Sequence, residues 1–314
     1  MVTVPEGQGT LSGSYESKID YNSTGDPASV HLPAVGGLPS EKLDLAYNAT
    51  GMPSTLKGSA EYISSTRYTP FGEITQYMQG AKGKRMIHTT YLDDSTRRVT
   101  KSFANREVAP FELSEVDYTY DPADNITSLS ELREKTTRDT QCFRYDYLRR
   151  MTEGWTAKES CSSGPSAATV GGVTPYWHSY TFDPTGNRTS ETKHDVGSGE
   201  SRRTYTYPAA KGNQPHALSG VDSVEPTGTR KDSYAYDATG NTTIRKIGNS
   251  EQKLEWDTEG QLTKVTEGTK VTEYVYDAEG NRLLRKDPSG TTLYLLVLGQ
   301  VGAGGACLVG SVCR

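Results

Sequence analysis

Large apolar side chains are scarce in this chain of 314 residues: hydrophobic residues make up 33% of it, and only 5 residues are phenylalanine. No stretch reaches the roughly 18 consecutive apolar residues that a membrane-spanning helix needs. The first residues also lack the basic and apolar regions of a signal peptide. The sequence therefore predicts no membrane span, and a chain that is either cytosolic or an internal part of an exported protein.

An excess of positive charge is also missing. The 34 Lys and Arg residues are interspersed with 39 Asp and Glu residues, which gives a formal net charge of -5. Nucleic-acid-binding proteins gather basic residues into patches or stripes. Nucleic acid is therefore not expected as a partner.

Motifs that carry chemistry are absent from the sequence. The 5 histidines are scattered without the spacing of metal ligands, and no Gly-x-Ser-x-Gly elbow, phosphate-binding loop or dinucleotide fingerprint occurs. We expect no catalytic residue, no cofactor-binding residue and no metal site, and we predict that the chain is not an enzyme.

Cysteine is rare, with 4 residues in the chain. Cys142 and Cys161 bracket a segment that could loop back on itself, which makes them a candidate disulfide; the alternative is two unrelated buried thiols. Cys307 and Cys313 lie near the C-terminus. Neither pair has the spacing of a zinc site.

Tyrosine and glycine are abundant, with 20 and 32 residues, and this composition favours strands and turns. The segments YAYDATGN at 234–241, LEWDTEGQ at 254–261 and YVYDAEGN at 274–281 form a repeat whose aspartates are 20 residues apart. Looser copies lie upstream. The residues expected to build the repeat are Tyr118, Tyr120, Asp121, Tyr180, Asp183, Gly186, Asn187, Tyr234, Tyr236, Asp237, Gly240, Asn241, Trp256, Asp257, Gly260, Tyr274, Tyr276, Asp277, Gly280 and Asn281.

Each repeat predicts a β-hairpin. Aromatic residues two apart project from the same face of a strand, and Asp-x-x-Gly is a turn in which the aspartate caps free amides and the glycine adopts a positive φ. Alternating residues after the turn predict a return strand. Since a lone hairpin is marginal in water, we expect an all-β fold of stacked hairpins, in which tyrosines pack and the repeated aspartates cap turns.

The repeat divides the chain into three predicted regions. Residues 1–39 are expected to be a linker or an irregular first repeat, residues 40–296 the repeat segment, and residues 297–314 an aberrant tail that does not join the sheet well. Inside the repeat segment, the residues at 154–176 and 208–229 predict surface loops. Some helical character is predicted around 82–88.

The motif Tyr-x-Tyr-Asp-x-x-Gly-Asn followed by Arg-Leu, as at 274–283, resembles the YD repeats of the Rhs family, whose relatives include toxin-complex C components and teneurins. The resemblance implies a spiralling β-sheet shell that encloses a C-terminal toxin domain and shields the bacterial producer from it. It also implies a protein that is secreted or located in the cell envelope. The partner would be that toxin domain, which this chain lacks, so the chain is interpreted as a truncated shell.

Members of this family end the shell with a DPxG motif whose aspartates perform self-cleavage. Asp287-Pro288-Ser289-Gly290 matches that pattern, but its position between two alternating segments predicts an ordinary hairpin turn.

Two other functions are compatible with the residues. Regular rows of Tyr and Trp could stack on sugars in a cell-surface module for carbohydrate binding or adhesion, which makes glycans an alternative partner. A hydrolase with an unrecognised site is the weaker alternative.

Overall fold

The computed structural model describes residues 2–4, 6, 11–35, 38–209, 211–294 and 312–313. The regular structure of the described chain is almost all strand, apart from short 3-10 turns such as η2 (Cys161–Ser163). Within the described ranges, no helix is long or apolar enough to cross a membrane. The prediction of an all-β fold is therefore confirmed.

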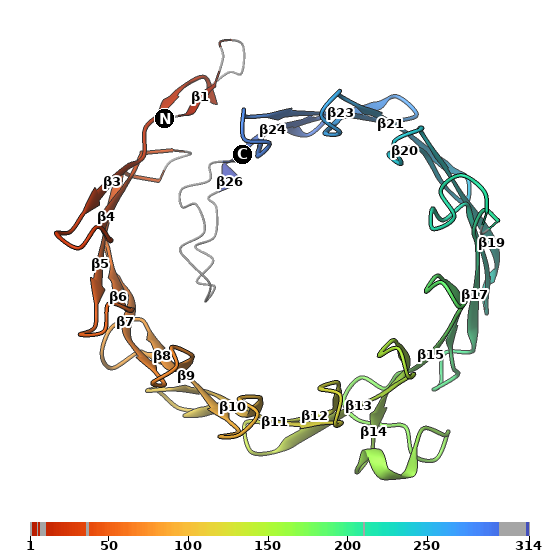
Figure 1. Ribbon diagram of the computed structural model, residues 1–314, viewed down its shortest axis with the longest axis horizontal. Coiled ribbons are helices and arrows are strands. Elements are labelled where there is room, and N and C mark those ends of the chain that lie inside the picture. Colours follow the sequence, from red (N-terminus) through yellow and green to blue (C-terminus); the bar gives the residue numbers. More distant parts are fainter. Residues whose placement is uncertain are drawn as a thin grey trace. The chain divides into compact units, whose positions relative to one another are not determined.

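The chain forms two compact units, residues 1–115 with 274–314 and residues 116–273. In each unit, consecutive strands lie side by side in chain order (Figure 1). The chain passes from the first unit to the second within strand β11 (Glu112–Tyr120), and it returns to the first unit within β23 (Lys270–Tyr276).

The first unit contains a small two-stranded sheet, a run of antiparallel strands near the N-terminus and a short run near the C-terminus. Its strands are β1 (Val2–Val4), β2 (Gly13–Tyr15), β3 (Lys18–Tyr21), β4 (Pro27–Leu32), β5 (Glu41–Tyr47), β6 (Pro53–Lys57), β7 (Glu61–Tyr68), β8 (Ile74–Gln79), β9 (Met86–Leu92), β10 (Val99–Arg106), β24 (Arg282–Asp287), β25 (Gly290–Tyr294) and β26 (Val312–Cys313).

The second unit is a run of antiparallel neighbours from β12 to β23. Its strands are β12 (Ile126–Arg133), β13 (Thr137–Tyr145), β14 (Met151–Ala157), β15 (Trp177–Phe182), β16 (Arg188–Lys193), β17 (Ser201–Thr206), β18 (Gly220–Glu225), β19 (Gly228–Tyr236), β20 (Thr242–Ile247), β21 (Ser250–Trp256) and β22 (Leu262–Glu267).

Buried side chains are few, because most strand residues are half-buried on both faces. Two clusters stand out among the described residues. One gathers Val4, Leu11, Leu283, Leu284 and Leu293 in the first unit. The other gathers Cys142, Trp155, Ala157 and Val170 in the second unit. Most of the sheet is therefore held by backbone hydrogen bonds and rows of half-buried side chains rather than by a central core.

Several segments differ from their predicted structure. Strand β14 includes residues 154–157, which were predicted to belong to a loop; burial of Trp155 outweighs the glycine and serine content around it. Strands β18 and β19 include most of 220–229, also predicted as loop. The helical prediction at 82–88 is wrong, because a turn there leads into β9.

The two ends of the chain were predicted to lie outside the repeat segment. Within residues 1–39, β3 and β4 form a hairpin with Tyr21 opposite Pro27. In the tail, residues 297–311 and 314 lie outside the described residues, and Cys307 is among them. The described pair Val312–Cys313 pairs with β25.

Candidate functional site

The turn after each aromatic strand is the structural unit that recurs along this chain. In the repeat at 234–241, the Asp237 amide donates to the Asn241 carbonyl at 2.9 Å, and the Gly240 amide donates to the Asp237 carbonyl at 3.2 Å. The Asp237 Oδ1 atom accepts the amides of Thr239 and Asn241, each at 2.9 Å. Gly240 has a φ of 94°, which suits glycine best.

Hydrogen bonds to its carboxylate make Asp237 a fixed anion. The Thr239 hydroxyl donates to Oδ1 at 2.7 Å, and the Asn241 side-chain amide donates to Oδ2 at 3.1 Å. These donors, the Thr239 hydroxyl first, lower the pKa of Asp237 to about 2. A carboxylate that is ionised and saturated with hydrogen bonds is suited to capping a turn rather than to acid-base chemistry.

The same turn occurs in both units. The backbone bond across five residues recurs at Asn22, Asn48, Thr69, Asp121, Asp146, Asp183, Asp257 and Asp277. At three of these positions the capping side chain is Asn or Thr. For example, Asn48 Oδ1 accepts the amides of Thr50 and Met52. The copies at Asn22 and Thr69 are harder to find in the sequence because the capping residue is not aspartate.

A β-bulge precedes the turn and sets the direction of the second aromatic residue. Tyr236 lies opposite Thr242, and Ala235 lies opposite Ile244, so one extra residue is inserted in the returning strand. Similar register shifts occur at Trp256 and Tyr47. Bulges of this kind re-aim a side chain and increase the local twist of the strand.

The second aromatic residue of the repeat hydrogen-bonds to the preceding hairpin. The Tyr236 hydroxyl donates to the Leu218 carbonyl at 2.8 Å, and Trp256 Nε1 donates to the Thr242 carbonyl at 2.8 Å. The same contact joins Tyr47 to Pro27, Tyr68 to Pro53, Tyr145 to Ile126 and Tyr207 to Arg188. These aromatic residues therefore form a ladder whose polar atoms are already occupied.

The arginine after the turn has a packing role that the sequence reasoning did not assign. The Arg188 guanidinium lies over the rings of Tyr180 and Tyr205, at 5.5 and 4.5 Å from their centroids. Arg282 lies in the same way over Tyr274 and Tyr294, at 5.8 and 4.1 Å. A cation between the first aromatic residues of two hairpins adds cation-π attraction to their packing.

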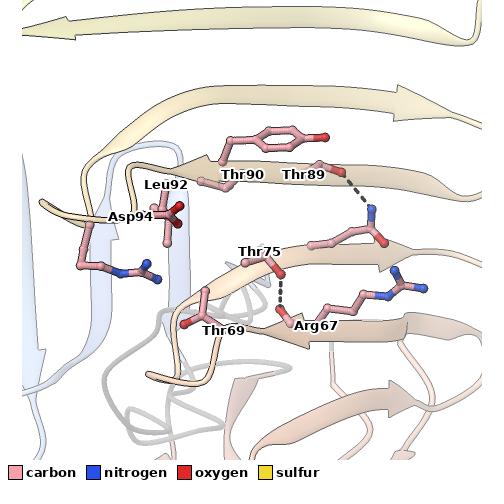
Figure 2. Close-up of a pocket in the computed structure, with 10 residues that line it drawn as sticks. Arg67, Thr69, Thr75, Thr89, Thr90, Leu92 and Asp94 are labelled. Carbon is pink, nitrogen blue, oxygen red and sulfur yellow. Dashed lines mark hydrogen bonds between the residues drawn. The ribbon is translucent and has the colours of Figure 1, made fainter.

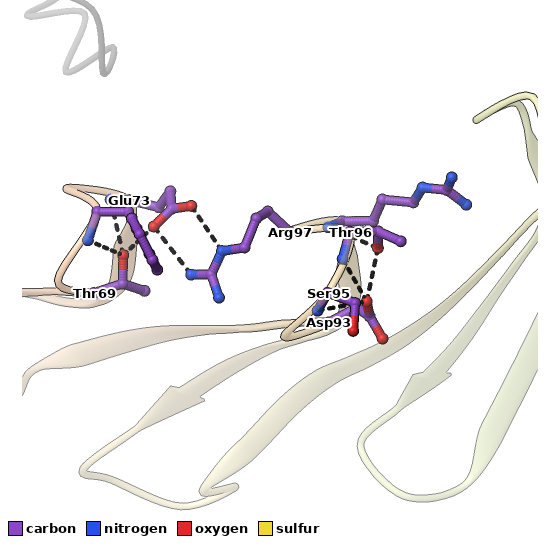
Figure 3. A network of polar contacts seen from close by, with 8 residues as sticks. Thr69, Glu73, Asp93, Ser95, Thr96 and Arg97 are labelled. Carbon is purple, nitrogen blue, oxygen red and sulfur yellow. Dashed lines mark hydrogen bonds and ion pairs between the residues drawn. The ribbon is translucent and has the colours of Figure 1, made fainter.

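Side chains also connect one turn to the next along the sheet edge. Figure 3 shows Glu73, in the turn after β7, accepting two hydrogen bonds from Arg97, in the turn after β9, at 3.0 and 3.1 Å. In the second unit, Arg150 Nη1 donates to the Asp183 carbonyl at 2.9 Å, and Gln214 Nε2 donates to the Asp237 carbonyl at 2.7 Å. Gln214 belongs to the loop before β18. This loop therefore contacts the next turn in the way that the turn containing Arg150 does.

The predicted repeat residues lie in equivalent places within these hairpins. The tyrosines and Trp256 lie on β11, β15, β19, β21 and β23, and the aspartates, glycines and asparagines lie in the turns that follow. The glycines at 186, 260 and 280 also have positive φ. The repeat positions are therefore distributed one set per hairpin and do not converge on one point.

The loop between β14 and β15 is held by a disulfide between Cys142 and Cys161, whose Cα atoms are 5.5 Å apart. The loop and its neighbours cover Trp155, which is 2% exposed, and Val170, which is 6% exposed. Arg144 lies 4.9 Å from the centre of the Trp155 ring. This insertion builds the only cluster of buried apolar side chains found in the described residues of the second unit.

A polar cluster lies on the neighbouring strands β16 and β17. Glu191 is 7% exposed and accepts the Tyr205 hydroxyl at 2.8 Å, and its carboxylate lies 3.6 Å from Arg188 and 3.9 Å from Arg203. Burial, followed by the bond to Glu191, raises the pKa of Tyr205 to about 12. Arg203 also lies 3.8 Å from Glu225, so two arginines face two carboxylates within the sheet.

Two groups of serine, histidine and carboxylate approach the composition of a hydrolase site. Ser179 Oγ lies 2.8 Å from His194 Nε2, but Glu200 lies 3.8 Å from His194 Nδ1, too far for a hydrogen bond. In the second group, His31 uses the same Nε2 atom toward both Ser29 and Asp20. Neither carboxylate holds the opposite ring nitrogen as a catalytic triad requires.

Asp287 lies in a two-residue hairpin turn, as its sequence context predicts. Asp287 pairs with Gly290 between β24 and β25. Its Oδ1 atom accepts the Ser289 amide at 2.8 Å, and Arg285 Nε donates to Oδ2 at 2.8 Å. These partners, the Ser289 hydroxyl first, hold the pKa of Asp287 well below its usual range.

A groove in the first unit lies on strands β7, β8 and β9 and has a volume of about 330 Å³ (Figure 2). Arg67, Thr75, Thr89 and Asp94 are among its lining residues. Within this groove, the Gln76 side-chain amide donates to the Thr89 hydroxyl at 3.0 Å.

As for metals, the described residues contain no group of three or more His, Cys, Asp or Glu side chains placed to hold an ion.

Comparison with known proteins agrees with this repeat. The family model described as Teneurin YD-shell matches residues 176–296. The crystal structure titled TcdB2-TccC3-TEV matches 90% of this chain with a TM-score of 0.54 and 16% identity, and that titled TcdB2-TccC3 without hypervariable C-terminal region matches 89% with a TM-score of 0.54 and 15% identity. No curated protein matches the sequence.

The chain spans only 14% of the length of each of those two structures, and the identity is low, so the likeness to them is one of fold. The family match covers the most regular repeats, including the turns at Asp183, Asp237, Asp257 and Asp277. The recurring turn, the aromatic ladder and the family model matched by residues 176–296 together support the resemblance to the Rhs/YD-repeat family.

Proposed function

We propose that this chain is a non-catalytic wall segment of a larger exported protein, in which the sheet encloses a C-terminal toxin domain. The observation that carries the proposal is the repeated turn and ladder, because the same hydrogen bond joins each of these hairpins to the one before it. One of the similar structures is titled as lacking a hypervariable C-terminal region. A protein with a constant wall and a variable cargo would have such an organisation.

Two further features support the proposal. The disulfide between Cys142 and Cys161 suits an oxidising compartment, as expected of an exported protein. The polar cluster on β16 and β17 pairs Arg188 and Arg203 with Glu191 and Glu225, which makes this part of the sheet hydrophilic and internally neutralised. Such a surface would hold a cargo domain without sticking to it.

Small-angle scattering tests the wall proposal. A compact globule of this length would have a radius of gyration of about 20 Å. We expect a clearly larger value, because a single-layered sheet lacks the second packed layer that makes a globule compact. A value near that of the globule would contradict the proposal.

Protease protection tests the cargo. In a longer product that carries a domain after the repeats, we expect that domain to resist a protease that digests it when it is expressed alone. Equal digestion in both contexts would refute enclosure while leaving the wall itself intact.

A glycan-binding module is the second candidate, favoured by the groove on β7–β9. Its lining is rich in hydroxyls and includes Tyr91, which is 55% exposed and could stack on a sugar. Titration of the wild-type chain and a Tyr91→Ala variant with a panel of oligosaccharides separates the two functions. Saturable binding that Tyr91→Ala abolishes would favour the module.

A further inference from the structure

The last hairpin departs from the hairpin before it at one cross-strand pair. In the hairpin of β22 and β23, Lys264 lies opposite Glu273. At the equivalent positions 20 residues later, Leu284 lies opposite Leu293. A charged pair is thus replaced by an apolar pair on the same face of the repeat.

Burial changes with the side chains. Leu284 is 1% exposed and Leu293 is 0% exposed, whereas Glu273 is exposed and Lys264 half-buried. Residues outside the repeats bury these two leucines. The apolar pair therefore forms a surface on the last hairpin that another segment covers.

The N-terminal hairpin provides the cover. Val4 and Leu11, which are 2% and 7% exposed, join the same cluster as the leucines of β24 and β25. The Tyr15 hydroxyl donates to the Leu11 carbonyl at 2.9 Å, and this bond holds Leu11 against β2.

The cover is attached through its side chains. Strands β1 and β2 form a two-stranded sheet of their own, separate from the sheet that contains β24 and β25. A two-stranded hairpin is marginally stable alone in water. Its folding and its attachment should therefore depend on the same leucine contacts.

We infer that the leucine face of β24–β25 is a docking surface whose occupant is the N-terminal hairpin of β1 and β2, through Val4 and Leu11, and that this cover prevents a second copy of the chain from binding there. When the cover lifts, an apolar patch is exposed, and the N-terminal hairpin of another copy is its matching partner. This exchange is a domain swap. The inference does not depend on the proposed wall function.

Hydrogen exchange on the full chain tests the attachment. The double variant Leu284→Lys with Leu293→Glu installs the charged pair of the preceding hairpin, which that hairpin tolerates. We expect amides of residues 2–15 to exchange at least tenfold faster in this variant. The matched control, Ile244→Lys with Lys253→Glu, places the same pair on β20–β21 and should leave residues 2–15 unchanged.

Unchanged exchange at residues 2–15 in the leucine double variant would overturn the inference, provided that the amides of β19 to β21 stay protected and so report a native sheet. Equal acceleration in the control variant would also overturn it, because the effect would then not be specific to the leucine face.

Sedimentation tests the second part, the role of a second copy. Leu11→Asp leaves the docking surface intact but disables the hairpin, whereas the leucine double variant keeps the hairpin and loses the surface. We expect each variant alone to stay monomeric, and an equimolar mixture of the two to form a heterodimer whose fraction rises with concentration. No heterodimer in the mixture, while Leu11→Asp alone binds an apolar dye, would show that the exposed surface does not capture a second copy.

Discussion

The regular hairpins from β19 to β23 and the disulfide-bearing region from β13 to β15 use the same turn but hold their strands in different ways. In the regular hairpins, two-residue connections such as that between Ile247 and Ser250 return the chain at once. In the other region, the return from β14 to β15 passes through a long loop that covers Trp155.

This difference shows what a single-layered sheet lacks. Side chains of the regular hairpins, such as Ile244 at 36% exposed and Val275 at 37%, remain partly in water, so stability there is spread over many small contacts. Where the loop folds back, Trp155 and Cys142 lose nearly all exposure, and stability becomes concentrated in a local core.

The largest expected effect is from Trp155→Ala, which would break the local core. Truncating a fully buried tryptophan costs about 3–5 kcal/mol. We expect hydrogen exchange to accelerate strongly in β13 to β15 and little in β19 to β23. The matched variant Trp256→Ala truncates a half-buried residue and should cost less. A larger loss at Trp256 would mean that the regular hairpins also depend on a concentrated core.

The second effect is from removing the disulfide by Cys142→Ala with Cys161→Ala. Since the bond closes a loop with a sequence separation of 19, loop-closure entropy predicts a loss of about 3 kcal/mol. Urea unfolding followed by Trp fluorescence, together with exchange at residues 137–177, measures it. If β19 to β23 lost as much protection as β13 to β15, the two regions would be one cooperative unit.

A smaller effect is expected from removing one hydroxyl of the aromatic ladder. Tyr145→Phe and Tyr236→Phe each remove one hydrogen bond to a carbonyl of the preceding hairpin, which should cost about 1 kcal/mol. Because the geometry is the same in both regions, the two variants should shift the urea midpoint by similar amounts. Unequal shifts would show that the ladder is not equivalent along the sheet.

The smallest effect concerns acid. Since the pKa of Asp237 is lowered to about 2 in the folded chain, its contribution to stability is present above its ordinary pKa of 3.8 and is lost as the pH falls toward 2. Asp237→Asn should fold, because Asn48 caps the same turn, and should show a weaker loss of stability between pH 4 and pH 2. If the pH dependence of stability were the same in Asp237→Asn as in the wild type, protonation of Asp237 would not contribute to the loss of stability in acid.

Much of this architecture follows from local residue patterns. Aromatic residues two apart, followed by Asp-x-x-Gly-Asn, predict a strand and a capped turn without knowledge of distant residues, and the structure has this arrangement at Asp183, Asp237 and Asp277. The pattern is weaker where Asn22 or Thr69 replaces the aspartate. The loops predicted at 154–176 and 208–229 include strands because pairing with neighbours outweighs their local glycine and proline content.

The sequence by itself determined the repeat, the positions of the Asp-x-x-Gly turns and the all-β fold, because these depend on side-chain alternation and on turn chemistry within a few residues. Only the tertiary structure decided which distant groups meet. The Gln214 contact with the Asp237 carbonyl, the cover that Leu11 places over Leu284 and Leu293, and the core around Trp155 all join residues far apart in the chain. Such contacts depend on how hairpins stack and where loops fold back, and no local pattern encodes them.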